Sequence, residues 1–505
     1  MIDQKIKLIT GSLLHDIGKV VYREGSDRRN HSVSGYDFLK EEGKIEDKEI
    51  LDCVRYHHFS EIKSAHLKED NLAYIVYLAD NIAAFADRRK KEDTEEKGFD
   101  LSVPLQSVFN VLNGNNQSFY YQPGDMDDQG KINYPASEKK PFSREFYMKI
   151  CQRMLDNFRG MNWSEEYLNS LLAVMEANLS YMPSSTSNEE LSDISLFDHV
   201  KLTAAISSCI YDYLNENHLS YKTELFDKKD FYDRNAFLLC SMDISGIQSF
   251  IYTISSKNAL KTLRARSFYL EIMMEHIIDF LLDRLQLSRA NLLYSGGGHC
   301  YLLLANTTET VMQIQKFQEE LKEWLLKQFQ TDLFVAFGYV QCTGNAFRNV
   351  PEGSYTELFR KMSKMLSLQK QHRYTAREII RLNNRKEQDY SRECKVCKKI
   401  GHVDEEGVCP LCRKIEKLSK NVLYADFFSV ILENPDERED AMPLPGGYCL
   451  VADDEKKLCR RMENDDYFVR SYSKNKLYTG KHIATKLWVG DYSTGSTFEE
   501  FAREA

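Results

Sequence analysis

The sequence contains no long hydrophobic run, since no stretch of about 18 apolar residues occurs anywhere in its 505 residues. We therefore expect no membrane-spanning helix. The first residues also lack the layout of a signal peptide, because lysines and then His15 and Asp16 interrupt their apolar stretch. Both absences predict a protein that stays in the cytoplasm.

A disulfide framework and an excess of positive charge are missing as well. Eight of the 12 cysteines are scattered singly and the other four form two close pairs, which is typical of a reducing compartment with one metal site. The net charge of -9 argues against a protein that coats nucleic acid along its whole surface. It does not exclude local basic patches that bind nucleic acid. A composition of 42% hydrophobic and 28% charged residues is ordinary for a soluble globular protein.

The chain length predicts several domains, and the apolar periodicity changes along the chain accordingly. Residues 1–220 have helical spacing, with a polar, turn-rich insertion near 113–143. Residues 221–345 follow the order β-α-β-β-α-β, which is the ferredoxin-like unit of polymerase and nucleotide-cyclase palm domains. Residues 346–420 look helical and carry the cysteine pairs, whereas 421–505 are mixed. The expected fold class is multidomain α/β (α+β), with an all-helical first domain.

Individual elements follow from the same two periodicities, 3.6 residues for helices and 2 for strands. A hairpin is expected around the glycines at 296–298, where two apolar runs meet. The expected helices are 6–13, 50–56, 72–85, 196–214, 258–286 and 308–328, and the expected strands are 237–244, 332–341, 422–428 and 448–452.

Histidines and aspartates recur along the helical first domain in a metal-binding pattern. The adjacent pair His15 and Asp16 suits a two-metal site, because the aspartate can bridge two cations while the histidine binds one. Such a site activates a water and clamps the attacking and leaving oxygens of a phosphodiester. The alternative, a satisfied core or surface side chain, is preferred for isolated residues such as His66 and His218. The candidate metal ligands are His15, Asp16, His57, His58 and Asp80, with His15 and Asp16 as the catalytic pair, and His31 belongs to the same series of histidines.

The predicted palm lacks the carboxylates that catalysis needs. Asp243 ends its first strand, where an active palm holds Mg²⁺, but the hairpin turn at 296–299 reads Gly-Gly-Gly-His and supplies no carboxylate. Phosphoryl transfer then lacks its main electrostatic aid, so we expect no catalysis by this palm. Its glycines either let a backbone approach a nucleotide closely or only form a tight turn.

Two cysteine knuckles predict a structural zinc ribbon. Cys394 and Cys397 form the first CxxC pair, Cys409 and Cys412 form the second, and eleven residues separate the pairs. Four thiolates close a tetrahedral shell and leave no open position for catalysis. Redox-active pairs are the alternative, and His402 between the knuckles is expected to be a loop residue rather than a ligand.

A basic segment precedes the knuckles. Residues 360–386 contain nine Lys or Arg and a single acidic residue, Glu378. Four arginines recur every four residues and are expected to share one helix face that contacts an RNA or DNA backbone. A solvated face or a subunit contact is the alternative. The four arginines are Arg373, Arg377, Arg381 and Arg385.

These motifs together resemble a known family. The segments 12–20 (SLLHDIGKV), 55–58 (RYHH), 77–89 and 193–206 are similar to the HD region of the large subunit of type III CRISPR effector complexes, of the Csm (III-A) kind. In that family the HD domain is circularly permuted and cleaves single-stranded DNA. The permutation implies that His199 is a further metal ligand, with a structural packing role as the alternative.

The resemblance extends to the palm, where segment 243–252 and the glycine hairpin are similar to the first palm of the family. The imidazole and carboxylate donors of the HD site predict a divalent transition metal, Mn, Co or Ni. The resemblance implies ATP with Mg²⁺, shared with a second palm for the synthesis of cyclic oligoadenylates. The second palm's Gly-Gly-Asp-Asp motif does not occur in this sequence, so we expect a truncated form of the larger subunit. The implied nucleotide-binding residues are Asp243, Ser245, Gly246, Gln248, Gly296, Gly297 and Gly298.

The implied partners are the other subunits of a type III-A ribonucleoprotein, guide RNA, target RNA, single-stranded DNA and ATP, with no membrane. The basic segment is then expected to contact the guide RNA or a neighbouring subunit. Two alternatives stay open. HD domains also hydrolyse mononucleotides, so the chain could be a nucleotide phosphohydrolase, or it could be an assembly scaffold with a degenerate HD site.

Overall fold

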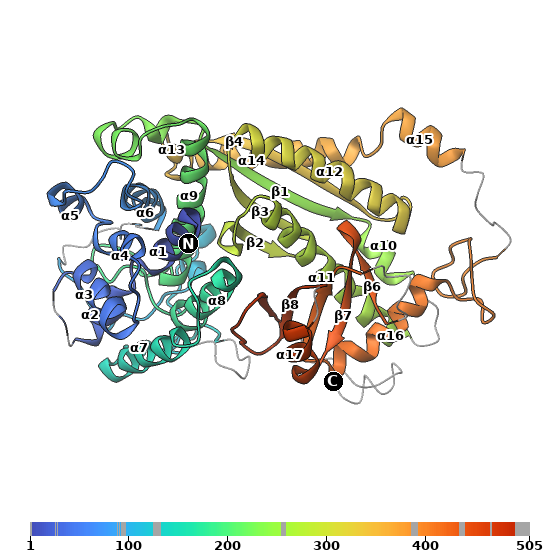
Figure 1. Ribbon diagram of the computed structural model, residues 1–505, viewed down its shortest axis with the longest axis horizontal. Coiled ribbons are helices and arrows are strands. Elements are labelled where there is room, and N and C mark those ends of the chain that lie inside the picture. The colour runs from blue at the N-terminus through green and yellow to red at the C-terminus, as the bar shows by residue number, and fades with distance from the viewer. Residues whose placement is uncertain are drawn as a thin grey trace.

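The computed structural model describes residues 3–489 except 26, 28, 88, 90, 92–96, 125–132, 254–258, 385–391, 434–439 and 465–466. A helical half, which contains α1 to α9, lies beside a second half built on two β-sheets (Figure 1). This arrangement confirms the predicted class, a multidomain α/β chain with a helical N-terminal part.

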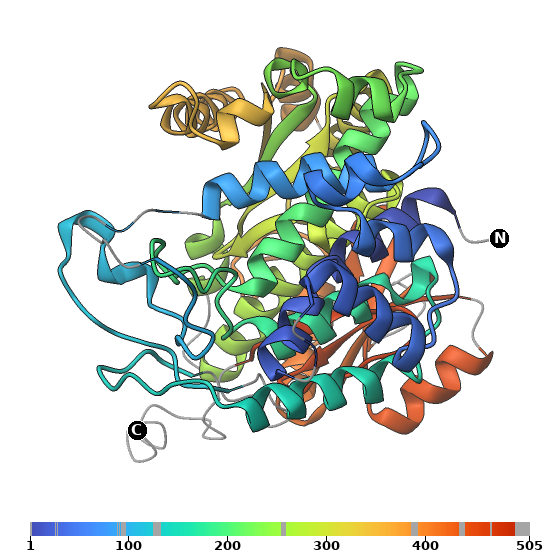
Figure 2. The same cartoon turned by 90° about the vertical axis from the view of Figure 1, so that its left-hand side faces the viewer.

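The helical half is built around α1 and α9, which pack against each other and against α4 and α6. Capping residues set where these helices begin: Asp3 caps α1, Asp47 caps α4 and Ser195 caps α9. Figure 2 looks onto this half, with the sheets behind it. Its helices are α1 Gln4–Leu14, α2 Gly18–Glu24, α3 His31–Asp37, α4 Lys48–Arg55, α5 Phe59–Ser64, α6 Ala73–Asp87, α7 Arg144–Phe158, α8 Leu168–Leu179 and α9 Leu196–Glu216.

The first sheet is antiparallel with strand order β2-β3-β1-β4, which is the order of a ferredoxin-like unit. Strand β1 alternates between two cores: Leu238 and Cys240 face α11 and α12, whereas Leu239 faces α9 and α14. The elements are β1 Phe237–Ser245, α10 Ile247–Tyr252, α11 Ala259–Arg284, β2 Leu292–Gly296, β3 His299–Ala305, α12 Thr308–Phe329, β4 Phe334–Cys342, α13 Gly344–Phe347 and α14 Ser354–Gln371.

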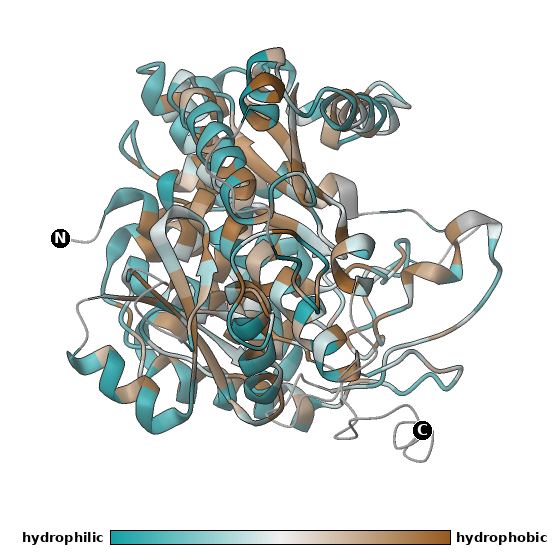
Figure 3. Ribbon diagram, turned by 90° about the vertical axis from the view of Figure 1, so that its right-hand side faces the viewer, coloured by the Kyte–Doolittle hydropathy of each residue, from teal (hydrophilic) through white to brown (hydrophobic). Residues whose placement is uncertain are grey.

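A second sheet, with order β6-β7-β5-β8-β9, shares its core with α11 of the first sheet. The predicted strand at 422–428 is wrong in its first half, because α16 continues through Val422, whose side chain packs with Ile415 and Leu418 at helical spacing. In Figure 3 the strands are largely brown and the teal residues are concentrated on the outer helices. The elements are α16 Pro410–Tyr424, β5 Phe427–Ile431, β6 Met442–Leu444, β7 Tyr448–Asp453, α17 Glu455–Asn464, β8 Phe468–Lys474 and β9 Ile483–Leu487.

The predicted single arginine face is also wrong. Helix α14 ends at Gln371, and a new helix, α15 (Ala376–Asn383), begins after Thr375, whose side chain forms a capping box with Glu378. Arg373 therefore lies in the break between two helices, where its guanidinium packs over Phe334. Arg377 and Arg381 lie on α15, and Arg385 lies outside the described residues.

The described part of the chain contains no helix that combines the length and the hydropathy needed to cross a membrane. All twelve cysteines lie within it, and none of them forms a disulfide.

Candidate metal centres and palm site

Four predicted ligands meet where α1, α6 and α9 pack together. His15 and Asp16 follow α1, Asp80 lies on α6, and His199 lies in the first turn of α9. All four side chains are buried, and one potential ligand atom from each lies within 4.8 Å of the other three. The structure thus brings His199 to the same place as the HD pair, although it is far away in the sequence.

Three more histidines form a second group beside the first. His31 begins α3, and His57 and His58 lie in the turn between α4 and α5. Nε2 of His31 lies 2.8 Å from Nε2 of His58 and 3.4 Å from Nε2 of His57. Three imidazoles converge in this way around a cation more readily than in a hydrophobic core.

The Asp16 carboxylate lies between the two groups. Its Oδ2 is 3.4 Å from Nε2 of His15 and 3.2 Å from Nε2 of His199. Its Oδ1 is 3.3 Å from Nε2 of His31 and 3.7 Å from Nε2 of His57. One carboxylate with a histidine set on each oxygen is the arrangement that bridges two cations.

Backbone carbonyl groups fix the orientation of two of these rings. Nδ1 of His15 lies 2.7 Å from the Ser12 carbonyl oxygen, and Nδ1 of His57 lies 2.7 Å from the Val54 carbonyl oxygen. When Nδ1 carries the proton and donates it to the carbonyl, Nε2 presents a lone pair to the interior of the site. Both rings are therefore oriented as metal ligands.

The charges of the site also suit a cation. Burial lowers the pKa of His57, and it lowers the pKa of His58 to about 4, so both imidazoles are neutral at pH 7. Burial raises the pKa of Asp16, but the charges of Lys19 and His15 outweigh it, and the net pKa lies well below the usual range. The neutral imidazoles of His57 and His58 and the ionised carboxylate of Asp16 are donors that divalent transition metals bind.

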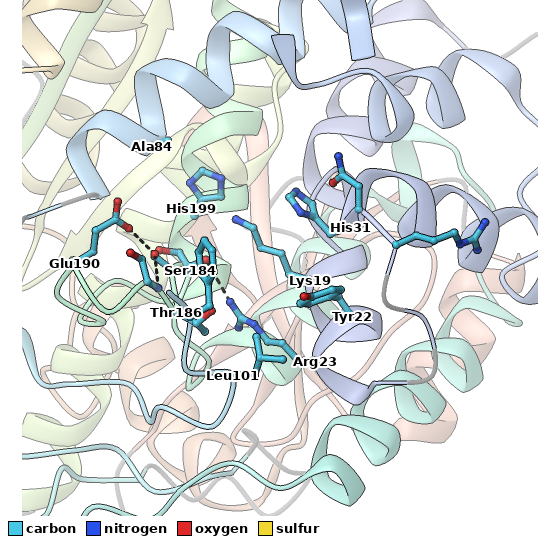
Figure 4. A pocket seen from close by; sticks show the side chains of 15 residues that line it. Lys19, Tyr22, Arg23, His31, Ala84, Leu101, Ser184, Thr186, Glu190 and His199 are labelled. Carbon is cyan, nitrogen blue, oxygen red and sulfur yellow. Dashed lines mark hydrogen bonds between the residues drawn. The ribbon is translucent and has the colours of Figure 1, made fainter. Parts of the chain in front are cut away.

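A pocket of about 490 Å³ opens beside the two groups and reaches one histidine of each, His31 and His199. Lys19 lies between the pocket and the site, with Nζ 2.5 Å from Oδ2 of Asp16. Figure 4 shows Lys19, Tyr22 and Arg23 from α2 on one side of it, and Ser184, Thr186 and Glu190 on the other. The sequence does not predict these lining residues as part of the site, since no spacing groups the 184–190 loop with α2.

The four knuckle cysteines also come together, with their sulfur atoms within 4.8 Å of one another. Cys397 has a lowered pKa because the thiols of Cys409 and Cys412 donate hydrogen bonds to it, and their pKa values are raised in return. Nη2 of Arg266 lies 3.5 Å from Sγ of Cys412. Four thiols this close all ionise only around a cation, which fits a tetrahedral zinc shell.

In the palm, two side chains of the protein, a lysine and a histidine, contact the Asp243 carboxylate. Nζ of Lys370 on α14 lies 3.0 Å from Oδ1, and Nδ1 of His299 lies 3.0 Å from Oδ2. Lys370 has no sequence signal, because nothing distinguishes it from the other basic residues of its segment. Ser241 lies 3.3 Å from the other nitrogen of His299, but its hydroxyl is fully buried and donates to the Cys300 carbonyl, so it is not a poised nucleophile.

The glycines predicted to contact a nucleotide have structural reasons of their own. Gly297 and Gly298 both have positive φ, 61° and 79°, and form the two-residue turn of the β2–β3 hairpin. Gly246 has φ 95°, and a Cβ there would lie 1.8 Å from the Asp332 carbonyl oxygen. They lie near Asp243 at one end of the sheet, as do Ser245, Gly296 and Gln248. Their nucleotide-binding role stays a prediction.

Comparison with known proteins supports the family that the motifs indicated. Models of the HD domain and of the Csm1 subunit domain B match residues 1–84 and 236–385. A CRISPR system single-strand-specific deoxyribonuclease Cas10/Csm1 (subtype III-A) from Enterococcus italicus is 41% identical over 97% of this chain and 66% of its own length. The protein of the same name from Mycobacterium tuberculosis is 39% identical over 99% of this chain and 67% of its own length.

Solved structures show the same fold. A Csm1-Csm4 cassette in complex with pppApA has a TM-score of 0.71 at 23% identity and covers 97% of this chain and 61% of that chain. A Csm1-Csm4 cassette in complex with one ATP has a TM-score of 0.70 at 24% identity, with 97% and 60% covered. The chain spans about two thirds of the length of the curated relatives. It belongs to the Cas10/Csm1 family of type III-A CRISPR systems.

Proposed function

We propose that this chain is the large subunit of an RNA-guided type III-A CRISPR effector, and that its HD site is a metal-dependent nuclease for single-stranded DNA. The name of its relatives, single-strand-specific deoxyribonuclease, supports the choice of substrate. The geometry of the histidine and aspartate groups supports the choice of chemistry.

The observation that carries the proposal is the position of Asp16 between two ligand groups. His15, Asp80 and His199 would hold one divalent metal with Asp16, and the histidines of the second group would hold another, with Mn, Co or Ni as the proposed ions. When bound, two such ions activate a water and clamp phosphodiester oxygens.

The protein's own residues prepare this site in two further ways. The carbonyl groups of Ser12 and Val54 hold the His15 and His57 rings in place, so these rings need no reorientation when metal ions bind. Lys19 extends from α2 into the boundary between the pocket and the site. Its ammonium group is positioned to stabilise the negative charge of an incoming phosphate.

For the palm we propose nucleotide binding without catalysis. The Asp243 carboxylate contacts Lys370 and His299, and the hairpin turn beside it supplies no second carboxylate. This palm therefore lacks a second acidic ligand for two Mg²⁺ ions. In the family, cyclic oligoadenylate synthesis also needs a second palm. The structure of a relative with one ATP supports the assignment of a nucleotide to this fold.

The remaining proposals concern zinc, partners and location. One structural zinc would bind the four knuckle cysteines. A Csm4-type subunit would be one partner, since a related structure is a Csm1-Csm4 subcomplex of a type III-A interference complex, and guide RNA and target RNA would be the others. Two of the four predicted arginines, Arg377 and Arg381, lie on the exposed helix α15 and would contact RNA. The free thiols support a reducing compartment, the cytoplasm.

Cleavage assays separate this proposal from its two rivals. The chain loaded with Mn²⁺ is incubated with a single-stranded oligonucleotide, with the matching duplex and with a panel of nucleoside triphosphates. We expect cleavage of the single strand and none of it after His15→Ala with Asp16→Ala. Hydrolysis of the nucleotides alone would favour a phosphohydrolase, and metal binding without any turnover would favour a scaffold.

A further inference from the structure

The pocket beside the HD site has a side chain that metal binding does not use. Phe99 lies at its rim and is 75% exposed, which is a large exposure for a phenylalanine. Its backbone is held in place, because residue 99 pairs with Ser187 in an isolated β-bridge and Asp100 donates a hydrogen bond to the Thr186 carbonyl, 2.9 Å long. A flat apolar ring on an anchored backbone is a stacking surface that has no partner within the described chain.

The opposite wall of the pocket is basic and is also fixed. Tyr22, Lys19 and Arg23 come from α2 (Figure 4). Nη1 of Arg23 donates to the Pro183 carbonyl oxygen, 2.8 Å away, and so ties α2 to the loop that carries Ser184. The pocket lining thus brings together two aromatic rings, an ammonium group that contacts Asp16, and two of the metal ligands, His31 and His199.

This set of groups matches the parts of one nucleotide of a DNA strand, its base and its phosphate. A base can lie on aromatic rings whatever its identity, because every base has a π face. The phosphate then reaches Lys19, and the phosphodiester bond reaches Asp16 and its histidines. A volume of about 490 Å³ is in the range of small-ligand pockets.

We infer that this pocket binds one unstacked nucleotide of the substrate, with its base against Phe99 and Tyr22, and that it makes the nuclease specific for single strands. A base in a duplex is already paired and stacked, so it can enter only after it is extruded, which is unfavourable. This inference rests on the proposed nuclease function and adds the residues that select the substrate.

A single abasic site in a single-stranded oligonucleotide tests it. The wild-type chain with Mn²⁺ should cut one of the two bonds beside the abasic position at least about 10-fold more slowly than the other bonds, because one base is missing from the pocket. Phe99→Ala should raise KM about 10-fold with kcat within about twofold, and should cut next to the abasic site as fast as elsewhere. Phe99→Trp should restore the wild-type pattern.

Phe109→Ala is the matched control, since Phe109 is 58% exposed and does not line the pocket. It should behave as the wild type. Efficient cleavage with no discrimination at the abasic site would overturn the inference and leave the proposed function intact. No cleavage of any single strand would overturn the proposed function instead. In that case 2-aminopurine fluorescence reports binding: a signal that changes on binding to the wild type but not to Phe99→Ala supports the pocket, and an equal change in both overturns it.

Discussion

Nε2 of His199 lies 3.2 Å from Oδ2 of Asp16. The HD family model covers residues 1–84, so this histidine reaches the site from outside the matched segment. The first ligand group is therefore complete only when α9 packs on α1, and the metal site depends on the fold of the whole helical half.

Replacing His199 should weaken metal binding. His199→Ala removes one nitrogen donor from a buried group. Mn²⁺ affinity should fall at least about 10-fold in calorimetric titrations, because even the loss of a residue that only hydrogen-bonds to a metal ligand lowers metal affinity about 10-fold or more. His66→Ala, at an exposed histidine outside both groups, is the control and should bind as the wild type. Unchanged Mn²⁺ affinity in His199→Ala would assign this histidine to helix packing.

The cysteine cluster should hold one zinc per chain. Cys397→Ser should lower the zinc content in elemental analysis and unfold the knuckle region at lower temperature, because metal binding contributes folding free energy there. Cys459→Ser removes an exposed single cysteine and should change neither quantity. Freshly purified wild-type protein without zinc would contradict the structural assignment.

The 505-residue chain should make no cyclic oligoadenylate from ATP and Mg²⁺, even with guide and target RNA present. Asp243 contacts Lys370 and His299, and a single carboxylate is too few acidic ligands to hold the two Mg²⁺ ions that bind the triphosphate of ATP. Chromatography after an overnight incubation with ATP checks this. A cyclic product that disappears in Asp243→Ala would mean that this palm catalyses after all.

Acid should destabilise the contact between α11 and the second sheet through His276. Burial, and then the charge of Arg470, lower its pKa from 6.5 to about 3, while Nε2 donates to the Pro445 carbonyl. Below pH 6.5 the imidazole binds a proton in the unfolded chain but not in the folded one, so protonation favours unfolding. The contribution of the neutral His276 to stability is therefore fully present above pH 6.5. It is lost as the pH falls from 6.5 towards 3, and the loss at pH 5 is about 2 kcal/mol.

The variant His276→Gln keeps a side-chain N–H donor but does not titrate. Urea unfolding at pH 7.5 and pH 5 should therefore show a smaller loss of stability in His276→Gln than in the wild type. His66→Gln, at an exposed histidine, should lose as much as the wild type. An identical loss in all three proteins would show that His276 is not the acid-sensitive group.

The sequence predicted those parts of the fold where one periodicity dominates. Helix α9 and strand β1 were both expected close to their observed bounds, because their apolar residues repeat cleanly. The prediction failed at 422–428, where the apolar residues that end an amphipathic helix run directly into those that begin a strand. It also failed at Arg373, because an i+4 repeat of arginines does not reveal a helix break. The capping box of Thr375 and Glu378 was the available signal.

For the site, residue types and spacing predicted His15, Asp16, His57, His58 and Asp80, and the family resemblance predicted His199. His31 was not among the predicted ligands, and its contacts with His58 and Asp16 identify it. The split of these ligands into two groups on the two oxygens of Asp16 required the packing of α1, α3, α6 and α9. Lys370 and Phe99 could not be found from the sequence. Their roles come from contacts with residues far away along the chain, Asp243 for the first and Ser187 for the second.

The most direct test of the central claim is the rate at which the Mn²⁺-loaded chain cleaves a single-stranded DNA oligonucleotide before and after Asp16→Ala. Asp16 is the shared residue of both ligand groups, so its loss should lower the rate at least about 100-fold while the duplex stays uncut throughout. An Asp16→Ala variant that folds as the wild type and cleaves the single strand at the wild-type rate would contradict the account.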